Sequence, residues 1–532
     1  MSPLAPESTV CVSWNQRAWW VMLSFVPSSL LLGTTTYLSM DIAAIPLLWV
    51  VPLGIYLLTF ILVFAKRPPI PRRIIVETVP TVILSFAVIM VARKLSPIWF
   101  VVPIHLAAFF VAAMACHGQL AQDRPSIQHL TEFYLWMSVG GVLGGVFNAL
   151  VAPMIFDTVV EYPLMMALAA VLWPGSSHGG QRPRINRFDY LTPMAFGMAY
   201  AALILCVKIL GLETSWAAML ALYGIPALIC LALFRHRPVR FGLGVGTFLM
   251  VGTLGMSGWE SALHVERSFF GVYRVEGAHS RTSLYHSLLH GTTLHGTQSL
   301  DPSRRRQPLS YFYPTGPLGQ VFEAFTGDVP RLRHVAIVGL GTGSTACYAT
   351  PGQNWTFYEI DPTVQRIATT PQYFTFLQDC LERLTVVLGD ARLSLLKAPN
   401  RYYDLVILDA FSSDAIPVHL LTQEALQLYF AKLADRGLVA VHISNRYLDL
   451  KPVVANLTTA NGFACLIRSD LHLSQEDIEA GKSPSVWMVL ARQPQDLERL
   501  AADSRWRTVV GQPGAVVWTD DFSNILSVFI KR

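Results

Sequence analysis

Several apolar runs in the second half of the chain end in residue types that bind nucleosides. These are three alternating glycines and four acids: Gly339, Gly341, Gly343, Glu359, Asp361, Asp390 and Asp409. Glycines permit a tight turn and a close approach of the backbone to a ligand, and a helix that begins at Ser344 is expected to direct its amino end toward that ligand. Carboxylates accept hydrogen bonds from sugar hydroxyls and base amino groups. The pattern therefore predicts a nucleoside site with an additional acid at the reacting position.

Each acid has an expected role that follows from its place after a strand. Glu359 or Asp361 accepts hydrogen bonds from both ribose hydroxyls, and Asp390 accepts one from an adenine amino group. Asp409 lies where the reacting group belongs. Acids at such places also serve as helix caps or turn residues. That explanation accounts for Asp390 or Asp414 singly, but poorly for four acids at one sheet edge.

These residues need a sheet that brings the strand ends together. Six predicted strands alternate with helical segments, at 334–338, 355–360, 384–388, 404–408, 437–443 and 485–491. This alternation is typical of a parallel, doubly wound α/β sheet, in which the ligand lies beyond the carboxyl ends of the strands. Two further predicted strand segments, 268–275 and 282–289, precede the glycines and indicate a small β subdomain.

The first half of the chain has the composition of a multi-helix transmembrane domain. Of the 532 residues, 52% are hydrophobic and only 14% are charged, which is too apolar for a soluble chain of this length. Eight runs approach the about 20 residues that cross a bilayer, at 19–38, 45–65, 74–92, 98–116, 133–156, 191–210, 216–234 and 241–258. The lipid bilayer is therefore an expected partner. Basic residues lie in short loops, not in a stripe along which nucleic acid would bind, so no nucleic-acid partner is expected.

Charge alternates between the loops that join these runs. The basic loops are 66–73, 182–187 and 235–240, and the loops between them hold Asp41, Asp157, Glu161 and Glu213. The positive-inside rule places the N-terminus and the basic loops in the cytoplasm, with the loop of Arg93 and Lys94 as an exception.

A ninth, shorter run at 162–173 leaves the helix count open. With nine crossings the C-terminal domain would lie outside the cell, where a nucleoside is scarce. We therefore expect 241–258 to be interfacial or re-entrant and the soluble domain to be cytoplasmic. The first run lacks a small-residue cleavage site, so a retained helix is expected and not a signal peptide.

Small and polar residues also occur within or beside the apolar runs. Four glycines form a small-residue face against which another helix can pack: Gly140, Gly141, Gly144 and Gly145. Four polar residues are costly in a membrane, and we expect helix pairing or snorkelling to explain them: His105, Glu132, Asn148 and Lys208. The seven cysteines form no CxxC pair, so isolated core thiols are expected, without a zinc site or a disulfide framework.

Over residues 263–495 the chain resembles the spermidine synthase family of aminopropyltransferases, and within it the membrane-fused bacterial branch described as fused MFS/spermidine synthase-like proteins. The resemblance rests on the glycine loop 339–343, Glu359-Ile360-Asp361, Gly389-Asp390-Ala391, Leu408-Asp409-Ala410-Phe411-Ser412-Ser413-Asp414-Ala415-Ile416-Pro417, 290–298 and Ser310-Tyr311-Phe312-Tyr313. It implies a Rossmann-like, class I methyltransferase-like sheet in an integral protein of the bacterial inner membrane.

The family transfers an aminopropyl group from decarboxylated S-adenosylmethionine to an amine such as putrescine and releases methylthioadenosine. The resemblance implies that Asp409 accepts the proton of the amine, that Glu359 binds the ribose and that Asp390 binds the adenine. It also implies that Tyr311 and Gln298 line the substrate pocket, without a metal. Members commonly form dimers through the soluble part, so a homodimer is implied as well.

The chain departs from the family pattern at three acidic positions. Thr342 stands where the family has an Asp in the glycine loop, Asp414 follows Asp409 by five residues in place of three, and Tyr313 replaces an acid beside the pocket tyrosine. Each change removes negative charge from the part of the site that would hold a diamine. Two acids near the C-terminus are the expected replacements: Asp520 and Asp521.

Three other functions remain as alternatives. An S-adenosylmethionine-dependent methyltransferase would share the glycine loop and the ribose acid. A non-catalytic sensor or transporter of polyamine or nucleoside fits the missing acids and the many helices. An NAD-dependent oxidoreductase fits poorly, because Ser344 occupies the sixth position of GxGxxG. The predicted domains are a polytopic membrane domain 1–258, a β subdomain 259–330, a nucleoside-binding catalytic domain 331–500 and a C-terminal extension 501–532.

Overall fold

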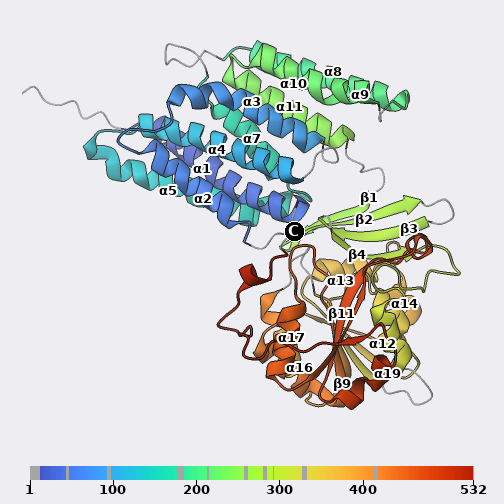
Figure 1. Cartoon of the computed structure of the whole chain (residues 1–532). Helices are drawn as coiled ribbons and strands as arrows, with labels where there is room; N and C mark the ends of the chain where they lie inside the picture. The colour runs from blue at the N-terminus through green and yellow to red at the C-terminus, as the bar shows by residue number, and fades with distance from the viewer. Residues whose placement is uncertain are drawn as a thin grey trace, which may run out of the picture. The chain divides into compact units, whose positions relative to one another are not determined.

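The computed structural model (Figure 1) describes most of the chain. The described residues are 12–42, 47–92, 98–175, 185–212, 215–256, 262–279, 284–291, 293–325, 332–410 and 417–530. The chain divides into two compact units, a helical unit that ends at Glu260 and a second unit that begins at Ser261.

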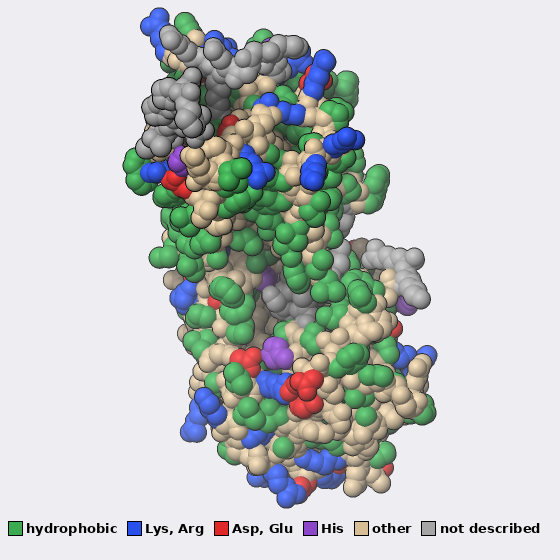
Figure 2. Space-filling view, turned by 90° about the vertical axis from the view of Figure 1, so that its left-hand side faces the viewer, with side chains coloured by type: hydrophobic (Ala, Val, Ile, Leu, Met, Phe, Trp, Pro, Cys, Tyr) green, Lys and Arg blue, Asp and Glu red, His purple; other side chains and the backbone are tan. Residues whose placement is uncertain are grey.

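The helical unit consists of apolar helices. Their bounds are α1 (Trp14–Tyr37), α2 (Val50–Val63), α3 (Arg72–Val91), α4 (Ile98–Gln122), α5 (Leu130–Val146), α6 (Ala152–Ile155), α7 (Glu161–Leu172), α8 (Phe188–Ile209), α9 (Trp216–Met219), α10 (Ile225–Ile229) and α11 (Pro238–Met256). Short π-helical turns join α5 to α6 and α9 to α10, so each pair forms one longer helical segment. Among the described residues, seven helices are long and apolar enough to cross a membrane, and α2 and α7 are shorter apolar helices. Figure 2 shows hydrophobic side chains over much of the visible face of this unit.

The glycine face predicted on α5 packs against α1. A Cβ atom added to Gly144 would lie 2.6 Å from the carbonyl oxygen of Phe25, and one added to Gly140 would collide with the carbonyl oxygen of Val21. No atom lies within 4 Å of a Cβ added to Gly141, on the other side of the helix. The small residues therefore let two helix backbones approach closely, as expected.

Three of the four polar residues singled out in the apolar runs have partners on other helices. Glu132 accepts a hydrogen bond from Arg17 of α1 at 2.6 Å, and Asn148 donates to Ser29 of α1. The buried ring of His105 lies 2.9 Å from the hydroxyl of Tyr162 on α7. Helix pairing therefore explains these residues.

The expectation that 241–258 is re-entrant is not met, whereas an interfacial position of this segment stays a prediction. Residues 238–256 form one continuous helix, α11, which packs against α3, α7 and α8. Asp189 at the start of α8 forms ion pairs with Arg237 at 2.9 Å and with Arg240 at 3.1 Å. These ion pairs connect α8 to the amino end of α11. Within α11, Gly242 and Gly252 leave room for Val171 and Val91 of the neighbouring helices.

The second unit contains two sheets. A four-stranded antiparallel sheet comprises β1 (Ala262–Ser268), β2 (Gly271–His279), β3 (Leu284–His290) and β4 (Thr293–Ser299). The larger sheet comprises β5 (His334–Val338), β6 (Asn354–Glu359), β7 (Leu384–Leu388), β8 (Tyr403–Leu408), β9 (Leu433–His442), β10 (Ala464–Asp470), β11 (Ser485–Ala491) and β12 (Arg507–Thr508). Its strand order is β12-β10-β11-β9-β8-β5-β6-β7, with β5 to β9 parallel. The expected doubly wound, Rossmann-like α/β sheet is confirmed.

Helices cover both faces of the larger sheet (Figure 1). One face packs against α12 (Pro317–Phe325), α13 (Pro362–Thr369), α14 (Phe376–Cys380) and α19 (Glu498–Ala501). The other face packs against α15 (Ala391–Lys397), α16 (Gln423–Lys432) and α17 (Lys451–Ala460). A further short helix, α18 (Gln475–Glu479), precedes β11. Because the ends of β5 and β8 at 335–338 and 405–408 are buried on both faces, these segments occur in the sequence as unbroken apolar runs.

The C-terminal segment packs onto the second unit. Trp518 and Val528 are buried in the core beside α16 and α17. The backbone of Gln423 also donates to the carbonyl of Trp518 at 2.8 Å.

Two local expectations near the glycine loop are wrong. Cys347 and Cys380 form a disulfide, although isolated thiols were expected, because the fold brings together cysteines that are 33 residues apart. The segment after Gly343 is a five-residue 3₁₀ helix, Ser344–Tyr348, and not a full α-helix. A helix this short has little macrodipole, so it lacks the electrostatic attraction for a ligand that was expected from a full α-helix.

Candidate active site

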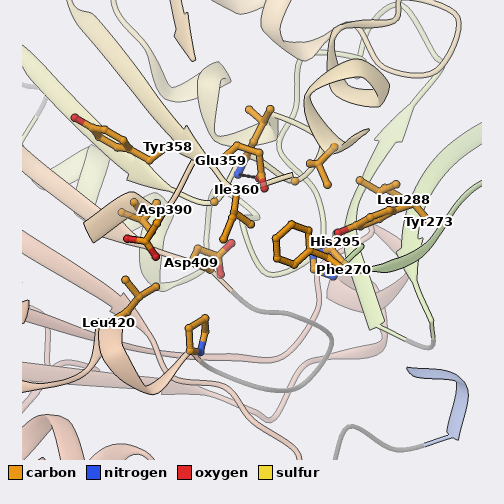
Figure 3. A pocket seen from close by; sticks show the side chains of 18 of the residues that line it. Phe270, Tyr273, Leu288, His295, Tyr358, Glu359, Ile360, Asp390, Asp409 and Leu420 are labelled. Carbon is orange, nitrogen blue, oxygen red and sulfur yellow. Dashed lines mark hydrogen bonds between the residues drawn. The ribbon is translucent and has the colours of Figure 1, made fainter. Parts of the chain in front are cut away.

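A cavity of about 270 Å³ lies at the carboxyl ends of the parallel strands. Its lining includes the glycine loop, the ends of β6 and β8, and residues of the smaller sheet. Figure 3 shows Asp390 and Leu420 on one side, Phe270, Tyr273, Leu288 and His295 on the other, and Asp409 between them. One end of the cavity therefore lies beside the helical segments that follow strands of the large sheet, and the other end lies against the β subdomain.

Backbone packing explains two glycines of the loop. Gly339 has a φ of +102°, and a Cβ atom there would collide with the carbonyl oxygen of Asp409. Gly341 has a φ of +53°, and a Cβ atom there would lie 2.8 Å from the carbonyl oxygen of His295. These conformations and contacts favour glycine. The loop is therefore held between β8 and the β subdomain while it lines the cavity.

Glu359 ends β6 and lines the cavity with both carboxylate oxygens engaged. One oxygen accepts the backbone N–H of Leu340 at 2.9 Å, and the other accepts the N–H of Asp361 at 2.9 Å. Burial raises the pKa of the Glu359 carboxyl, and these N–H groups act in the opposite direction. Each oxygen retains a lone pair, so Glu359 can still accept hydrogen bonds from a ligand.

Asp361 is not among the described residues that line the cavity. Its side chain caps α13 by accepting the N–H of Thr363 at 2.8 Å and also accepts the hydroxyl of Ser268 on β1. Asp361 therefore fastens the β subdomain to the large sheet. Of the two acids considered for the ribose, the structure brings only Glu359 to the cavity.

Asp390 lines the cavity at the amino end of α15. One oxygen caps that helix by accepting the N–H of Leu393 at 2.8 Å, and the other lies 2.9 Å from the His419 ring. The capping role considered from sequence is thus present together with the position expected for a base-binding residue. His419 also lines the cavity.

Asp409 ends the central strand β8 and is buried at the middle of the cavity. Its Oδ1 lies 2.6 Å from Nδ1 of His442 at the end of β9. Burial raises the pKa of the Asp409 carboxyl, whereas His442 and a hydrogen bond from Tyr311 lower it. Tyr311 lines the cavity, and its own pKa lies well above the usual value because it is buried beside Asp409.

The other residues proposed for the substrate lie elsewhere or outside the described residues. Gln298 binds the Thr375 backbone and hydroxyl at 2.9 and 2.8 Å, away from the described lining of the cavity. Asp520 receives two hydrogen bonds from Arg392, at 2.6 and 2.5 Å, and Asp521 is exposed. Asp414 lies in 411–416, outside the described residues.

Sequence reasoning missed residues on the β subdomain side of the cavity and behind Asp409. Phe270, Tyr273 and His295 line the cavity, and burial lowers the pKa of His295 to about 3, so its ring is neutral at physiological pH. His442 had a detectable signal, because it occupies the end of the predicted strand 437–443. No comparable signal marks the β subdomain residues, since their position depends on how the two sheets pack. Among the described residues, no cluster of potential metal ligands occurs.

Comparison with known proteins finds partial similarity to transferases. No protein-family model matches the chain. A polyamine aminopropyltransferase of Vibrio vulnificus is 34% identical over 118 residues, which cover 21% of this chain and 38% of that protein. An N-terminal histidine N-methyltransferase of Emericella nidulans is 30% identical over 165 residues, which cover 30% of this chain and 28% of that protein. The chain thus spans less than two fifths of the length of either relative.

Solved structures give a similarly partial match. A probable spermidine synthase from Corynebacterium glutamicum has 15% sequence identity and a TM-score of 0.36, over 49% of this chain and 97% of that one. A methyltransferase from Archaeoglobus fulgidus that depends on S-adenosylmethionine has 16% identity and a TM-score of 0.23, over 33% of this chain.

Proposed function

We propose that this chain is a membrane-anchored transferase that moves an aminopropyl group from decarboxylated S-adenosylmethionine to an amine. The observation that carries the proposal is the cavity in which Glu359, Asp390 and Asp409 come together at the carboxyl ends of β6, β7 and β8. In open α/β sheets, ligands bind at this edge, beyond the carboxyl ends of the strands. The partial similarity to a polyamine aminopropyltransferase agrees with this assignment.

The end of the cavity beside β6 and β7 fits a nucleoside. Glu359 retains lone pairs for two ribose hydroxyls, while its other lone pairs hold the glycine loop in place. Asp390 is available for an adenine amino group. Ile360, Val364 and Leu420 supply apolar surface for the faces of the base.

Asp409 fits the role of proton acceptor. When bound, the sulfonium co-substrate would supply an activated carbon and methylthioadenosine as a neutral leaving group. The attacking nitrogen forms a bond to that carbon, the C–S bond breaks with its electron pair going to sulfur, and the nitrogen proton passes to the Asp409 carboxylate. The side chain of Asp409 is only 9% exposed and accepts a hydrogen bond from Tyr311, which keeps the orientation of the carboxylate toward the reacting groups.

A second function, methyl transfer from S-adenosylmethionine, is favoured by the composition of the acceptor end. The described lining residues there are Phe270, Tyr273, Leu288, His295 and Tyr311, none of which is a carboxylate, and Asp409 lines the middle of the cavity. A diamine would need a second acid for its distant ammonium group, whereas the acceptor of a methyl group needs one nitrogen only. The partial similarity to a histidine N-methyltransferase is consistent with this alternative.

The test uses the full-length chain in detergent. Decarboxylated S-adenosylmethionine and S-adenosylmethionine are each incubated with putrescine, and methylthioadenosine and S-adenosylhomocysteine are measured by mass spectrometry. We expect methylthioadenosine and an aminopropylated amine from the wild type, but not from Asp409→Asn. Asp435→Asn is the matched control, because Asp435 is an exposed carboxylate paired with Arg401.

Other outcomes would redirect the assignment. Release of S-adenosylhomocysteine alone would establish methyl transfer. Binding of both nucleosides without any product would favour a non-catalytic sensor or transporter. Absence of nucleoside binding by calorimetry would refute the proposal as a whole.

We also propose that the helical unit anchors the chain in the bacterial inner membrane. Seven apolar helices of sufficient length support this location. Figure 2 shows Lys and Arg side chains in the upper part of the visible face of this unit, with hydrophobic side chains below them. Basic residues at one end of a helical bundle are typical of the cytoplasmic side of a membrane protein.

A further inference from the structure

The carboxylate of Asp409 is the first member of a hydrogen-bonded chain that leads away from the cavity. His442 Nδ1 lies 2.6 Å from Asp409 Oδ1, and His442 Nε2 lies 2.7 Å from the hydroxyl of Ser444. The Ser444 oxygen in turn accepts the backbone N–H of Val486 on β11 at 2.8 Å. The chain therefore runs from a fixed peptide group to the carboxylate.

The donor and acceptor capacities in this chain define one consistent arrangement of protons. A backbone N–H can only donate, so the hydroxyl of Ser444 is free to donate to Nε2 of His442. Nδ1 of His442 then carries the ring proton and donates it to Asp409. In this arrangement each hydrogen bond uses one proton.

Packing holds the His442 ring in this orientation. The ring is stacked between Tyr311, at a centroid distance of 4.7 Å, and Trp487 of β11, at 4.6 Å. Tyr311 is itself fixed because the Ser310 backbone donates to Gly481 at 2.7 Å and accepts from Ser483 at 3.1 Å. His442 is therefore held both by its ring faces and by its two nitrogens.

We infer that His442 and Ser444 are positioning residues for Asp409, which direct one face of its carboxylate to the cavity and keep it in the ionised form that accepts a proton. This inference rests on the proposed function in assigning that proton to an attacking amine. His442 lies behind Asp409 and is not among the described residues that line the cavity, so it acts through the carboxylate and not on the substrate.

The groups that face Asp409 determine the direction in which its pKa should change when His442 is replaced. His442 of β9 and Tyr311 both lower the pKa of the Asp409 carboxyl, against the larger effect of burial. Other ionisable groups line the same cavity: Glu359, Asp390, His295, His419, Tyr273 and Tyr358. Loss of the His442 donor therefore raises the pKa of Asp409 further, and protonation then occurs at higher pH.

The test follows protonation of Asp409 directly in the full-length chain in detergent. Infrared difference spectra against pH record the carbonyl stretch of buried carboxylic acids, and the Asp409 signal is the one absent from Asp409→Asn. This measurement needs neither nucleoside nor turnover. Its result is therefore independent of whether the proposed transferase activity is found.

Two substitutions separate the hydrogen bond from the ring stacking. His442→Phe keeps a ring between Tyr311 and Trp487 but has no donor. We expect the pH midpoint of Asp409 protonation to rise by about one to two units, which corresponds to the free energy of a hydrogen bond to a charged group. His442→Asn keeps a donor near the position of Nδ1, and its midpoint should stay closer to that of the wild type. Ser444→Ala should raise the midpoint by less than His442→Phe.

A matched control and a kinetic measurement complete the design. His334 lies at the amino end of β5, whereas the cavity lies at the carboxyl ends of the strands. His334→Phe should therefore leave the pH midpoint of Asp409 protonation unchanged. If turnover is found, the acidic limb of its pH profile should shift with the infrared midpoint in His442→Phe. An unchanged midpoint in His442→Phe would overturn the inference. Equal shifts in His442→Phe and His442→Asn would also overturn it, because they would assign the effect to packing alone.

Discussion

The disulfide between Cys347 and Cys380 makes a quantitative prediction about stability. The two cysteines are separated by 33 residues, and Cys347 lies in the 3₁₀ helix that follows the glycine loop. A cross-link that closes a loop of this length reduces the entropy of the unfolded chain by an amount equivalent to about 3.7 kcal/mol at 25 °C. For an unfolding unit of roughly 270 residues, this corresponds to a shift of about 7 °C in Tm.

The assay compares the wild type with the double variant Cys347→Ser/Cys380→Ser. Thermal unfolding of the full-length chain in detergent is followed by tryptophan fluorescence, with and without a reductant. We expect the reductant to lower the Tm of the wild type to that of the double variant, and to leave the double variant unchanged. Cys206→Ser is the control, because Cys206 is an exposed free thiol of α8.

Peptide-level alkylation provides the direct check on the bond itself. Cys347 and Cys380 should react with a maleimide only after reduction. If both react in the unreduced protein and the double variant unfolds at the wild-type temperature, the disulfide and the stability argument are both refuted.

Three further predictions concern the site and the helical unit. Glu359→Gln places an amide NH₂ against the backbone N–H of either Leu340 or Asp361. Methylthioadenosine should therefore bind about 10- to 100-fold more weakly, as measured by calorimetry. An unchanged affinity would mean that Glu359 only holds the glycine loop. Asp520→Ala removes a partly exposed ion pair with Arg392 and should cost only about 0.5 to 1 kcal/mol of stability, with no change in the KM of the amine. A raised KM would restore the amine-binding role predicted from sequence. Gly140→Ala should lower the Tm of the helical unit because the new methyl group meets α1, whereas Gly141→Ala should not; equal effects would contradict the close packing of these helices.

The central strands of the larger sheet could be predicted from sequence because their burial on both faces leaves an apolar run, as at 335–338, 405–408 and 438–441. Predicted strands 334–338, 384–388 and 485–491 have the observed bounds. Strand β10 was missed because its residues, which include the buried Arg468, do not form such a run. Strand β12 has only two residues and depends on pairing with β10.

The acids at strand ends were predictable for the same reason, since position along one strand fixes the sheet edge that a residue occupies. What the acids contact could not be predicted, because the contacts come from distant parts of the chain. Asp361 binds Ser268, 93 residues earlier, and Asp520 binds Arg392, 128 residues earlier. Asp520 was expected to supply charge to the amine site, but Arg392 neutralises it.

The continuous helix α11 changes the argument about the side of the membrane on which the second unit lies. Among the described residues, seven long apolar helices and the two shorter ones give nine segments. The short helix α7 lies within the bundle, packed against α1, α4 and α11. If all nine segments crossed the membrane, or the seven long ones alone, the end of α11 would lie opposite the beginning of α1, which the basic loops assign to the cytoplasm.

A disulfide between Cys347 and Cys380 leads to the same side, because disulfides persist in oxidising compartments and are rare in the cytosol. We therefore expect the second unit to lie outside the inner membrane, against the expectation from nucleoside supply. In intact cells, a membrane-impermeant maleimide should label Cys347 after treatment with an impermeant reductant. Labelling that requires permeabilised cells, with no reductant, would place the unit in the cytoplasm, where S-adenosyl donors are made. Labelling from outside would make group transfer depend on a donor that reaches that side, and would strengthen the case for a nucleoside or polyamine sensor.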